Sequence, residues 1–564
     1  MTAHRDERIR TFTERGFWTG ETLDDLLGAA LRAHPERLAL VDQPNRDALF
    51  GGTPQRLSYG ELERHVGAWT EVLEQHGIGA GDVLVAQLPN VTEFVLVYLA
   101  MARIGAIISP LPVQYGAHEL RMVSRELPAK AYLGITQVGG QAYGNHAMGA
   151  DIAFPKRLFL GSEPPQGGQS LDSDLAAALT ASRSGNGSKG SAKDAANDVF
   201  TVCWTSGTTG TPKGVPRTQN QWAAISWATF DAAELRDGDV LLNPFPFVNM
   251  ASIGGFLFNW LRCSGTLVLH HPLDLPVFLQ QIAAEGSSFT IAPPALLNML
   301  LKQESLLAQV DLSRLRAIGS GSAPLSPWMV RGFAEQHGID IINLFGSNEG
   351  ISLAAGPREI PDPEQRATLF PRFGARDLEW SNRVAAMIET RLVDTETGAE
   401  ITAVDSPGEL QVRGATLFDG YLGDTADNDA AFAEDGWFRT GDLFEITGSG
   451  DPPEYYRFVG RCKDIIVRGG YNISPDELDT LLASHPRLTE AACVGYPDDV
   501  LGEKVCVFVV PKPDAEVTLA DITAFLEEQG IARFKLPERL EVIDKLPRNA
   551  LAKVVRGELR QRLD

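Results

Sequence analysis

The sequence predicts an α/β protein with a large amino-terminal domain of several layers around parallel sheets, followed by a small α+β domain. The chain has 564 residues, which is enough for several units with large cores. Over most of its length, segments that read as buried strands alternate with segments that read as helices. A second alternation begins near Gly460, so we place the two domains at residues 1–460 and 461–564.

The first strand, helix and strand of this pattern fall within residues 82–110. Asp-Val-Leu-Val-Ala-Gln at 82–87 is typical of a buried strand, 92–103 of a helix, and Gly-Ala-Ile-Ile-Ser-Pro at 105–110 of the next strand. This spacing favours parallel strands joined by helical crossovers, and one large doubly wound body. Further strands are expected at 199–204, 265–270, 289–293 and 315–319.

The small domain is expected from a separate run of apolar segments near the carboxy terminus. These segments lie at 464–467, 475–483, 491–494, 505–510 and 519–529. The last stretch, 533–564, has nine Lys and Arg residues against five Asp and Glu. Earlier in the chain, residues 182–192 carry no apolar anchor before their last position, which indicates a surface loop or, alternatively, a domain linker.

Composition excludes several classes of function. The formal net charge of −23 repels phosphate backbones, so we expect no nucleic-acid partner. The longest apolar stretch, 93–112, is interrupted by Arg103, and the charged amino terminus does not resemble a signal peptide, so we expect no membrane span. Five scattered cysteines form no disulfide framework, which favours a cytoplasmic location.

A loop rich in glycine and hydroxyl residues follows the strand at 199–204. It reads Thr-Ser-Gly-Thr-Thr-Gly-Thr-Pro-Lys-Gly at 205–214. Glycine tolerates the backbone angles that turn several N–H groups toward one anion, and hydroxyls and an ammonium add to such a site. The loop is not a Walker A motif, because Lys213 follows Pro212 and precedes its glycine. A polar hairpin turn is the alternative interpretation.

The loop at 206–214 resembles the signature loop of the adenylate-forming superfamily, which includes acyl-CoA synthetases, aryl-acid ligases, nonribosomal adenylation domains and firefly luciferase. Five further segments resemble this family in the same order along the chain. They are Ser-Gly-Ser-Ala-Pro-Leu at 320–325, Leu-Phe-Gly-Ser-Asn-Glu-Gly at 344–350, Gly-Trp-Phe-Arg-Thr-Gly-Asp-Leu at 436–443, Gly-Arg-Cys-Lys-Asp at 460–464 with Gly-Gly-Tyr-Asn-Ile-Ser-Pro-Asp-Glu at 469–477, and Leu-Pro-Arg-Asn-Ala-Leu-Ala-Lys at 546–553.

The resemblance implies a reaction in two steps with ATP, Mg²⁺ and a thiol. A carboxylic acid is joined to the α-phosphorus of ATP with release of pyrophosphate, and a thiol then attacks the mixed anhydride. Between the steps the small domain is expected to swing, with Lys463 at its hinge. Gly470 would border the path of the pantetheine arm, because only glycine lets that arm pass close to the backbone.

The same resemblance implies roles for individual residues. Lys553 would be catalytic, because its ammonium would offset the charge that develops as the carboxylate meets the α-phosphate. Glu349 would be the second catalytic residue, as the Mg²⁺ ligand. The other residues expected to bind ATP are Thr205, Ser206, Gly207, Thr208, Thr209, Gly210 and Lys213 at the β- and γ-phosphates, Ser322, Ala323, Pro324, Phe345 and Gly346 beside adenine, Asn348 near the α-phosphate, Asp442 at the ribose, and Arg461 at the ribose or a phosphate.

Two residues depart from the family pattern. Asn348 stands where threonine is frequent, and Ala552 stands where glycine usually precedes the catalytic lysine. Further departures of this kind would suggest a nucleotide-binding regulator that has lost catalysis. A luciferase-like oxygenase, which shares the first half-reaction, is another alternative.

The resemblance implies that the acid binds at Phe247, Asn249, Met250 and Gly321. For Phe247 and Met250, ordinary core packing is an equal alternative. Amino-acid adenylating domains place an aspartate after the phenylalanine, whereas Val248 follows Phe247 and leaves a free amine without a counter-charge. Met250 cannot bond an ortho-hydroxyl, although aryl-acid ligases usually have asparagine there. We therefore favour a non-hydroxylated small-molecule acid of cyclic or medium-chain type, passed to coenzyme A.

The acceptor and the nearest subfamily remain open between two alternatives. The segments 15–18, 216–220 and 530–537 resemble both freestanding aryl-acid ligases and cyclohexanecarboxylate-type acyl-CoA ligases. The alternative to coenzyme A is therefore the pantetheine of a carrier protein, loaded by a freestanding aryl-acid AMP ligase. The sequence leaves a homodimer open as well.

Overall fold

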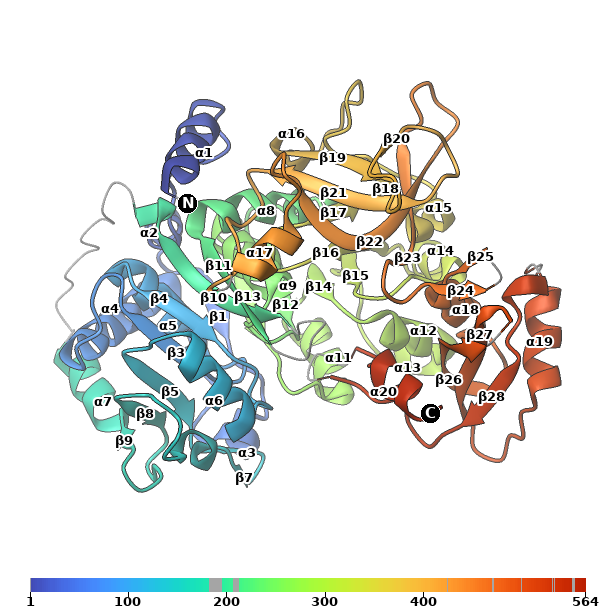
Figure 1. Cartoon of the computed structure of the whole chain (residues 1–564). Helices are drawn as coiled ribbons and strands as arrows, with labels where there is room; N and C mark the ends of the chain where they lie inside the picture. Colours follow the sequence, from blue (N-terminus) through green and yellow to red (C-terminus); the bar gives the residue numbers. More distant parts are fainter. Residues whose placement is uncertain are drawn as a thin grey trace.

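The computed structural model of the chain describes residues 2–181, 195–205, 212–423, 425–468, 471–498, 500–529, 531, 533–549 and 553–563. The predicted α/β class with parallel sheets is confirmed, and Figure 1 shows a large body with a smaller carboxy-terminal unit at its side. The loop expected at 182–192 lies outside the described residues. Within the described ranges, no helix combines the length and the apolar character needed to cross a bilayer.

The largest sheet has eight strands and carries the Glu349 motif at one edge. Its six inner strands are parallel, and an antiparallel strand closes each edge. The order is β17 (Ser352–Ala355), β16 (Asp340–Gly346), β15 (Ala317–Gly321), β14 (Phe289–Ile291), β12 (Val240–Asn243), β13 (Thr266–Leu269), β1 (Leu38–Val41) and β2 (Arg56–Ser58).

A second sheet of seven strands carries the phosphate loop at its edge. The strand predicted at 199–204 joins this sheet, where it is parallel to the strand predicted at 105–110. The order is β11 (Lys213–Thr218), β10 (Val199–Thr205), β4 (Ile107–Pro110), β3 (Val83–Gln87), β5 (Ala131–Ile135), β8 (Arg157–Leu160) and β9 (Gln169–Ser170). A separate short hairpin pairs β6 (Gln137–Val138) with β7 (Gln141–Ala142).

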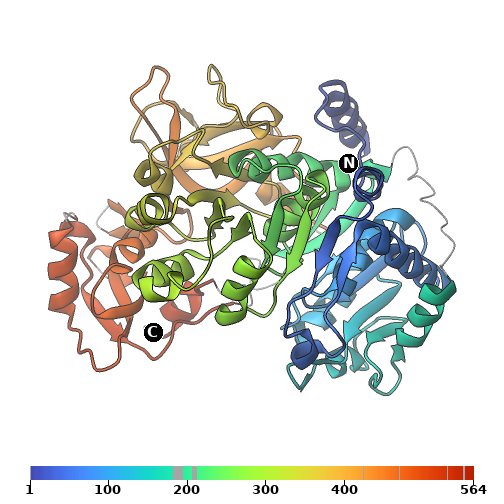
Figure 2. The same cartoon turned by 180° about the vertical axis from the view of Figure 1, so that it is seen from behind.

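A third sheet of six strands is antiparallel throughout and was not expected from the sequence. Figures 1 and 2 show it in gold and orange above the two parallel sheets. The order is β18 (Leu369–Pro371), β23 (Tyr455–Arg461), β22 (Phe438–Thr447), β21 (Gly408–Gly414), β19 (Ile388–Val393) and β20 (Glu400–Ile401).

The helices of the large unit cover the sheets and fill the space between them. The helix predicted at 92–103 is α5 (Thr92–Ile104), whose residues Thr92 to Ala102 are buried except for Glu93 and which ends at Gly105 in the left-handed conformation. Its nearly complete burial explains its almost continuous apolar sequence. The others are α1 (Thr2–Glu14), α2 (Leu23–Ala33), α3 (Arg46–Phe50), α4 (Tyr59–Gln75), α6 (Ala117–Glu126), α7 (Asp172–Ala181), α8 (Gln219–Ala232), α9 (Met250–Ser252), α10 (Phe258–Arg262), α11 (Leu275–Ala284), α12 (Pro294–Lys302), α13 (Glu304–Leu307), α14 (Pro327–His337), α15 (Pro363–Thr368), α16 (Val384–Met387) and α17 (Thr425–Ala431).

The carboxy-terminal unit has its own sheet and its own apolar clusters. The helix predicted at 475–483 is α18 (Pro475–Leu482), which begins after Ser474, because the Ser474 hydroxyl accepts from the Glu477 N–H and proline occupies the first turn. The remaining elements are β25 (Tyr471–Ile473), β24 (Ile466–Arg468), β27 (Gly502–Pro511), β26 (Leu488–Asp498), β28 (Arg539–Val542), α19 (Leu519–Glu528) and α20 (Arg556–Gln561).

The chain changes sheet between β23, which ends at Arg461, and β24, which begins at Ile466, and the division at residues 460 and 461 stays a prediction. Two apolar clusters of this unit draw their residues only from position 466 onward. In both views the unit lies beside α12, α13 and α14 of the large unit (Figures 1 and 2). The site described next lies where the two units meet.

Candidate active site

Lys553 belongs to the small unit, and its charge interacts with carboxylates of the large unit. A turn holds its backbone: the Asn549 N–H donates to Lys553 O at 2.9 Å, and the Lys553 N–H donates to Asn549 Oδ1 at 3.0 Å. Burial lowers the pKa of the ammonium, as does the charge of Arg461, whereas Asp442 and Glu349 act in the opposite direction. The small unit therefore brings its cation into the electrostatic field of both carboxylates.

Asp442 lies on β22, opposite Arg461 on β23. The Arg461 guanidinium is 3.4 Å from Asp442 Oδ1, and the two residues are register partners. Burial raises the pKa of Asp442 to about 6, although the charges of Arg461 and Lys553 partly offset this rise. Arg461 and Asp442 therefore lie together, and the charge of Lys553 acts on Asp442; the roles that the resemblance implies for these residues stay predictions.

Glu349 lies in the turn between β16 and β17. Its side chain accepts a hydrogen bond from the Tyr421 hydroxyl at 2.9 Å, and its carbonyl accepts from the Phe418 N–H at 2.8 Å. The next residue must be glycine, because Gly350 has φ +113° and a Cβ there would lie 2.1 Å from Thr416 O. This close approach holds the Glu349 turn against the segment at 416–421.

Lys213 begins β11 and is held by two partners on the segment that follows β21. Its ammonium lies 2.7 Å from Asp427 Oδ1 and 5.0 Å from the ring centroid of Tyr421. Thr205 ends β10 and is the register partner of Lys213. Ser206, Gly207, Thr208, Thr209 and Gly210, which were expected to hold phosphates, lie outside the described residues.

Arg217 links β11 to the turn that carries Glu349. It is fully buried, and its guanidinium donates to Asn348 O at 2.6 Å and to Thr416 O at 2.8 Å. Burial lowers its pKa to about 10. The sequence analysis assigned no role to Arg217, Tyr421 or Asp427. Of these three residues, only Arg217 lies in a segment, 216–220, whose sequence resembles the family.

The residues expected beside adenine lie at the ends of β15 and β16. Ser322, Ala323 and Pro324 form an exposed turn, and Ser322 has φ +69°. Phe345 is half-buried, with its ring centroid 5.0 Å from that of Phe444. Gly346 is exposed beside it. The Phe345 ring is therefore held by packing against Phe444.

The residues expected to bind the acid lie in and around the short helix α9. Phe247 is fully buried, with its ring 6.1 Å from those of Phe94 and Tyr98, so packing accounts for it. The Asn249 side chain caps α9 by accepting from the Ser252 N–H at 3.3 Å. The Met250 N–H donates to the Asn348 side chain at 2.8 Å.

The thioether of Met250 closes the space at the end of β16. A Cβ at Gly346 would lie only 2.3 Å from Met250 Cε, and a Cβ at Gly321 would lie 2.1 Å from Leu344 O. The absence of a side chain therefore lets Met250 approach the backbone at Gly346, and lets β16 approach the backbone at Gly321. Asn348 Oδ1 is engaged with the Met250 N–H, and the expected place of Asn348 near the α-phosphate stays a prediction.

The proposed hinge residue, Lys463, lies in the connection between β23 and β24. It is exposed, and the neighbouring Cys462 N–H donates to Gly441 O at 2.9 Å. This backbone bond ties the start of the connection to the strand that carries Asp442. Gly470 and Ala552 lie outside the described residues.

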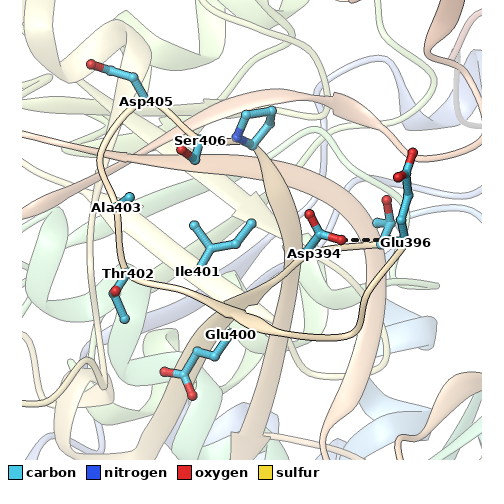
Figure 3. Close-up of a pocket in the computed structure, with 10 residues that line it drawn as sticks. Asp394, Glu396, Glu400, Ile401, Thr402, Ala403, Asp405 and Ser406 are labelled. Atoms are coloured by element: carbon cyan, nitrogen blue, oxygen red, sulfur yellow. Dashed lines mark hydrogen bonds between the residues drawn. The ribbon is translucent and has the colours of Figure 1, made fainter. Parts of the chain in front are cut away.

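A surface hollow elsewhere contains none of these residues. Figure 3 shows it at the edge of the six-stranded sheet, with Ile401 beside acidic side chains that include Asp394 and Glu400. The one hydrogen bond drawn there is local: the Glu396 N–H donates to Asp394 Oδ1. Lys553, Asp442 and Glu349, rather than this hollow, therefore form the candidate active site.

The side chains present fit Mg²⁺ bound together with a nucleotide. Within the described ranges, no group of three or more His, Cys, Asp or Glu side chains could hold a metal ion on its own. Mg²⁺ usually takes one or two carboxylates and completes its shell with water and phosphate oxygens. A single buried carboxylate at Glu349, which shares its neighbour Tyr421 with the cation Lys213, suits that arrangement.

Comparison with known families matches residues 29–422 to the AMP-binding enzyme and residues 477–553 to the AMP-binding enzyme C-terminal domain. The chain belongs to the AMP-binding enzyme family. The resemblance to the adenylate-forming superfamily is thereby confirmed.

Individual relatives cover nearly the whole chain. The medium-chain fatty-acid–CoA ligase of Escherichia coli K12 is 30% identical over 99% of this chain and 93% of its own length. The salicyl-AMP ligase / salicyl-S-ArCP synthetase of Mycobacterium tuberculosis is 28% identical over 97% and 92%. The structure of ATP-bound MatB from Rhodopseudomonas palustris has a TM-score of 0.76 at 24% identity, covering 96% of this chain and 99% of that one, which shows a shared fold.

Proposed function

We propose that the protein is an AMP-forming acid–thiol ligase, which activates a small-molecule carboxylic acid with ATP and transfers the acyl group to coenzyme A. The observation that carries this proposal is the position of Lys553, whose charge interacts with Asp442 and Glu349 of the other unit. A cation whose charge reaches two buried carboxylates is suited to a nucleotide that brings its own negative charge.

In the first step, an oxygen of the substrate carboxylate forms a bond to the α-phosphorus of ATP. The bond from that phosphorus to the oxygen bridging to the β-phosphate breaks, and pyrophosphate leaves. Lys553 would offset the charge at the reacting oxygens, and Lys213 would hold the departing phosphates. Asp442 would accept both ribose hydroxyls, because a carboxylate has two acceptor oxygens. Mg²⁺, held at Glu349, would neutralise phosphate charge.

In the second step, the thiol sulfur attacks the acyl carbonyl and AMP leaves. Lys553 occupies the position beside Asp442 and Glu349 in the present orientation, so the thiol requires the small unit to move. Lys463 lies in the exposed connection between the units and is the proposed pivot. Gly470 is the residue proposed to border the pantetheine path.

The acid is proposed to be non-hydroxylated and of cyclic or medium-chain type. Met250 offers a thioether at the end of β16, and the oxygen of Asn249 is engaged in capping α9. Neither group supplies a free amide oxygen for a hydroxyl on the acid. The similarity to a medium-chain fatty-acid–CoA ligase supports both this acid class and coenzyme A as the acceptor.

A second candidate is an aryl-acid AMP ligase that loads the pantetheine of a carrier protein. The similarity to a salicyl-AMP ligase / salicyl-S-ArCP synthetase favours it. The two candidates share the first half-reaction and differ in the acceptor.

A panel of carboxylates separates these candidates and tests the proposal itself. Each acid is incubated with ATP and Mg²⁺, with and without coenzyme A, while AMP and acyl-adenylate are measured. AMP release that depends on coenzyme A, strongest with cyclic or medium-chain acids, is the expected result. Adenylate that accumulates regardless of coenzyme A would support carrier loading, and absence of pyrophosphate exchange with every acid would contradict both candidates.

A further inference from the structure

Tyr421 contacts two charged groups of the candidate active site at once. Its hydroxyl donates to Glu349 Oε1 at 2.9 Å, and its ring centroid lies 5.0 Å from the Lys213 ammonium. The phenol and the ring face are different parts of one side chain, so both contacts are made together. Glu349 and Lys213 are 136 positions apart in the sequence, and Tyr421 comes from a third segment.

The backbone around Tyr421 is fixed from several sides. Its N–H donates to Asn428 Oδ1 at 2.7 Å, and its carbonyl accepts from Asn428 Nδ2 at 3.2 Å. The following Leu422 N–H donates to Gly214 O at 2.8 Å, which ties this segment to the strand that begins at Lys213. The ring of Phe418, itself buried, lies 4.9 Å from the Tyr421 ring.

We propose that Tyr421 is a positioning residue for MgATP binding. Its hydroxyl sets the orientation of the Glu349 carboxylate, and its ring face sets the place of the Lys213 ammonium. The inference rests on the proposed function, because Glu349 and Lys213 are there assigned to Mg²⁺ and the phosphates.

The physical basis is preorganisation. A carboxylate rotates in a broad, shallow torsional well, so an isolated glutamate would lose this freedom when a metal ion binds. The hydrogen bond from Tyr421 restricts that rotation beforehand. For Lys213 the ring is a neutral support, whereas its other partner, Asp427, carries a charge that phosphate would have to replace.

The decisive variant is Tyr421→Phe, which removes the hydroxyl and keeps the ring. Mn²⁺ serves as the probe, and free Mn²⁺ is measured by electron paramagnetic resonance with the full-length protein and an ATP analogue that has a methylene group between its α- and β-phosphorus atoms. We expect Mn²⁺ to bind roughly tenfold more weakly, since hydrogen bonds to charged groups are the stronger kind. Binding of the analogue without metal should stay unchanged.

Tyr421→Leu removes the ring as well. It should also weaken binding of the analogue without metal, because Lys213 then loses its support. The Mg²⁺ concentration that gives half-maximal adenylation should rise in both variants, while the KM for the acid stays constant. Asn428→Ser, which loosens the backbone and keeps the phenol, should give an intermediate loss of Mn²⁺ affinity.

Two controls separate positioning from a structural effect. Tyr132→Phe removes another buried phenol, one that donates to Gln87 at 2.6 Å, and should leave Mn²⁺ affinity unchanged. In the Glu349→Gln background, Tyr421→Phe should have no further effect, because the two residues act through one interaction.

The outcomes also distinguish the inference from the proposed function. Equal Mn²⁺ affinity in wild type and Tyr421→Phe, with a loss in Glu349→Gln, overturns the role of Tyr421 alone. Unchanged Mn²⁺ affinity in Glu349→Gln overturns the proposed metal site together with the inference.

Discussion

Lys553 is the residue on which the proposed first step depends most. Its ammonium is the charge that the small unit contributes beside Asp442 and Glu349. Lys553→Ala should lower acyl-adenylate formation by at least roughly 100-fold, a magnitude typical of lost transition-state stabilisation. Thioester formation from presynthesised acyl-adenylate should remain near the wild-type rate, because that step does not use this cation.

The control for this prediction is Lys545→Ala, which removes an exposed lysine of the same unit. Pyrophosphate exchange reports the first half-reaction, and acyl-CoA formation from added adenylate reports the second. Equal losses in both half-reactions would contradict the assigned role.

Asp442 gives the proposed ATP site a dependence on pH. Burial raises its pKa to about 6, Asp476 and Glu349 add to the rise, and Arg461 and Lys553 oppose it. The ribose hydroxyls need the ionised carboxylate as acceptor. As pH falls through about 6, the carboxyl takes up a proton, so the KM for MgATP should rise on the acid side and level off above it.

The check is the KM for MgATP as a function of pH in wild type and in Asp442→Asn. The amide variant should have a raised KM at neutral pH and should lose the acid limb, because its side chain does not titrate in this range. An acid limb that survives in Asp442→Asn would assign the titration to another group.

Sequence motifs predicted part of this site and missed another part for a physical reason. Glu349, Asp442 and Lys553 stand in segments whose pattern is recognisable from the sequence. The contact of Lys213 with Asp427 joins residues 214 positions apart, and it depends on how two sheets pack. Tyr421 has only a short glycine-flanked context, so no local pattern indicated its place beside Glu349.

Helix α1 fastens the segment that leads to Tyr421. Arg8 on this helix donates to Gly414 O at 3.1 Å and to Leu417 O at 2.8 Å, and it also pairs with Asp419. Trp18, just after the helix, donates to Ala415 O at 3.0 Å. An element at the amino terminus thus holds the 414–421 segment from outside.

Arg8→Met should loosen that segment without removing its apolar contacts. Loss of hydrogen bonds to buried carbonyls costs about 1–3 kcal/mol. We expect faster hydrogen exchange over 414–421 and a raised KM for MgATP, whereas Arg10→Met, at an exposed position of the same helix, should match wild type. Unchanged exchange in Arg8→Met would show that the segment is held by other contacts.

At the level of elements, the local patterns predicted strands and helices but not their partners. The strand at 82–87 and the helix at 92–103 are present as β3 and α5. Periodicity does not specify that β10 pairs with β4 while β12 pairs with β13 in another sheet, because such pairing joins distant parts of the chain. The parallel strands therefore form two sheets, where the sequence had suggested one body.

Part of the antiparallel sheet was missed because β22 and β23 lack clean alternation, whereas β19 alternates. Burial along β22 changes irregularly from residue to residue, and its pairing with β21 and with β23 includes register shifts. Such irregularity hides a period of two in the sequence.

At the scale of the whole molecule, the two units meet with like charges opposed. Lys302, at the end of α12, has a pKa lowered by partial burial and by the charge of Lys512 in the small unit. The Lys302 ammonium also lies 5.5 Å from the ring centroid of Trp328 on α14. We expect this repulsion to oppose the orientation in which Lys553 acts on the carboxylates, and so to favour release of the small unit after adenylation.

Lys302→Glu should reverse the sign of this contact and stabilise the present orientation. An exposed charge pair contributes about 0.2–1 kcal/mol, so we expect pyrophosphate exchange to rise and the thioester step to slow, each by less than about fivefold. Lys302→Met should give a smaller change in the same direction. Combining Lys302→Glu with Lys512→Glu restores repulsion and should return both rates toward wild type, and high salt should shrink every difference. Slowing of both half-reactions in Lys302→Glu, unaffected by the second substitution, would show that this contact does not govern the movement of the small unit.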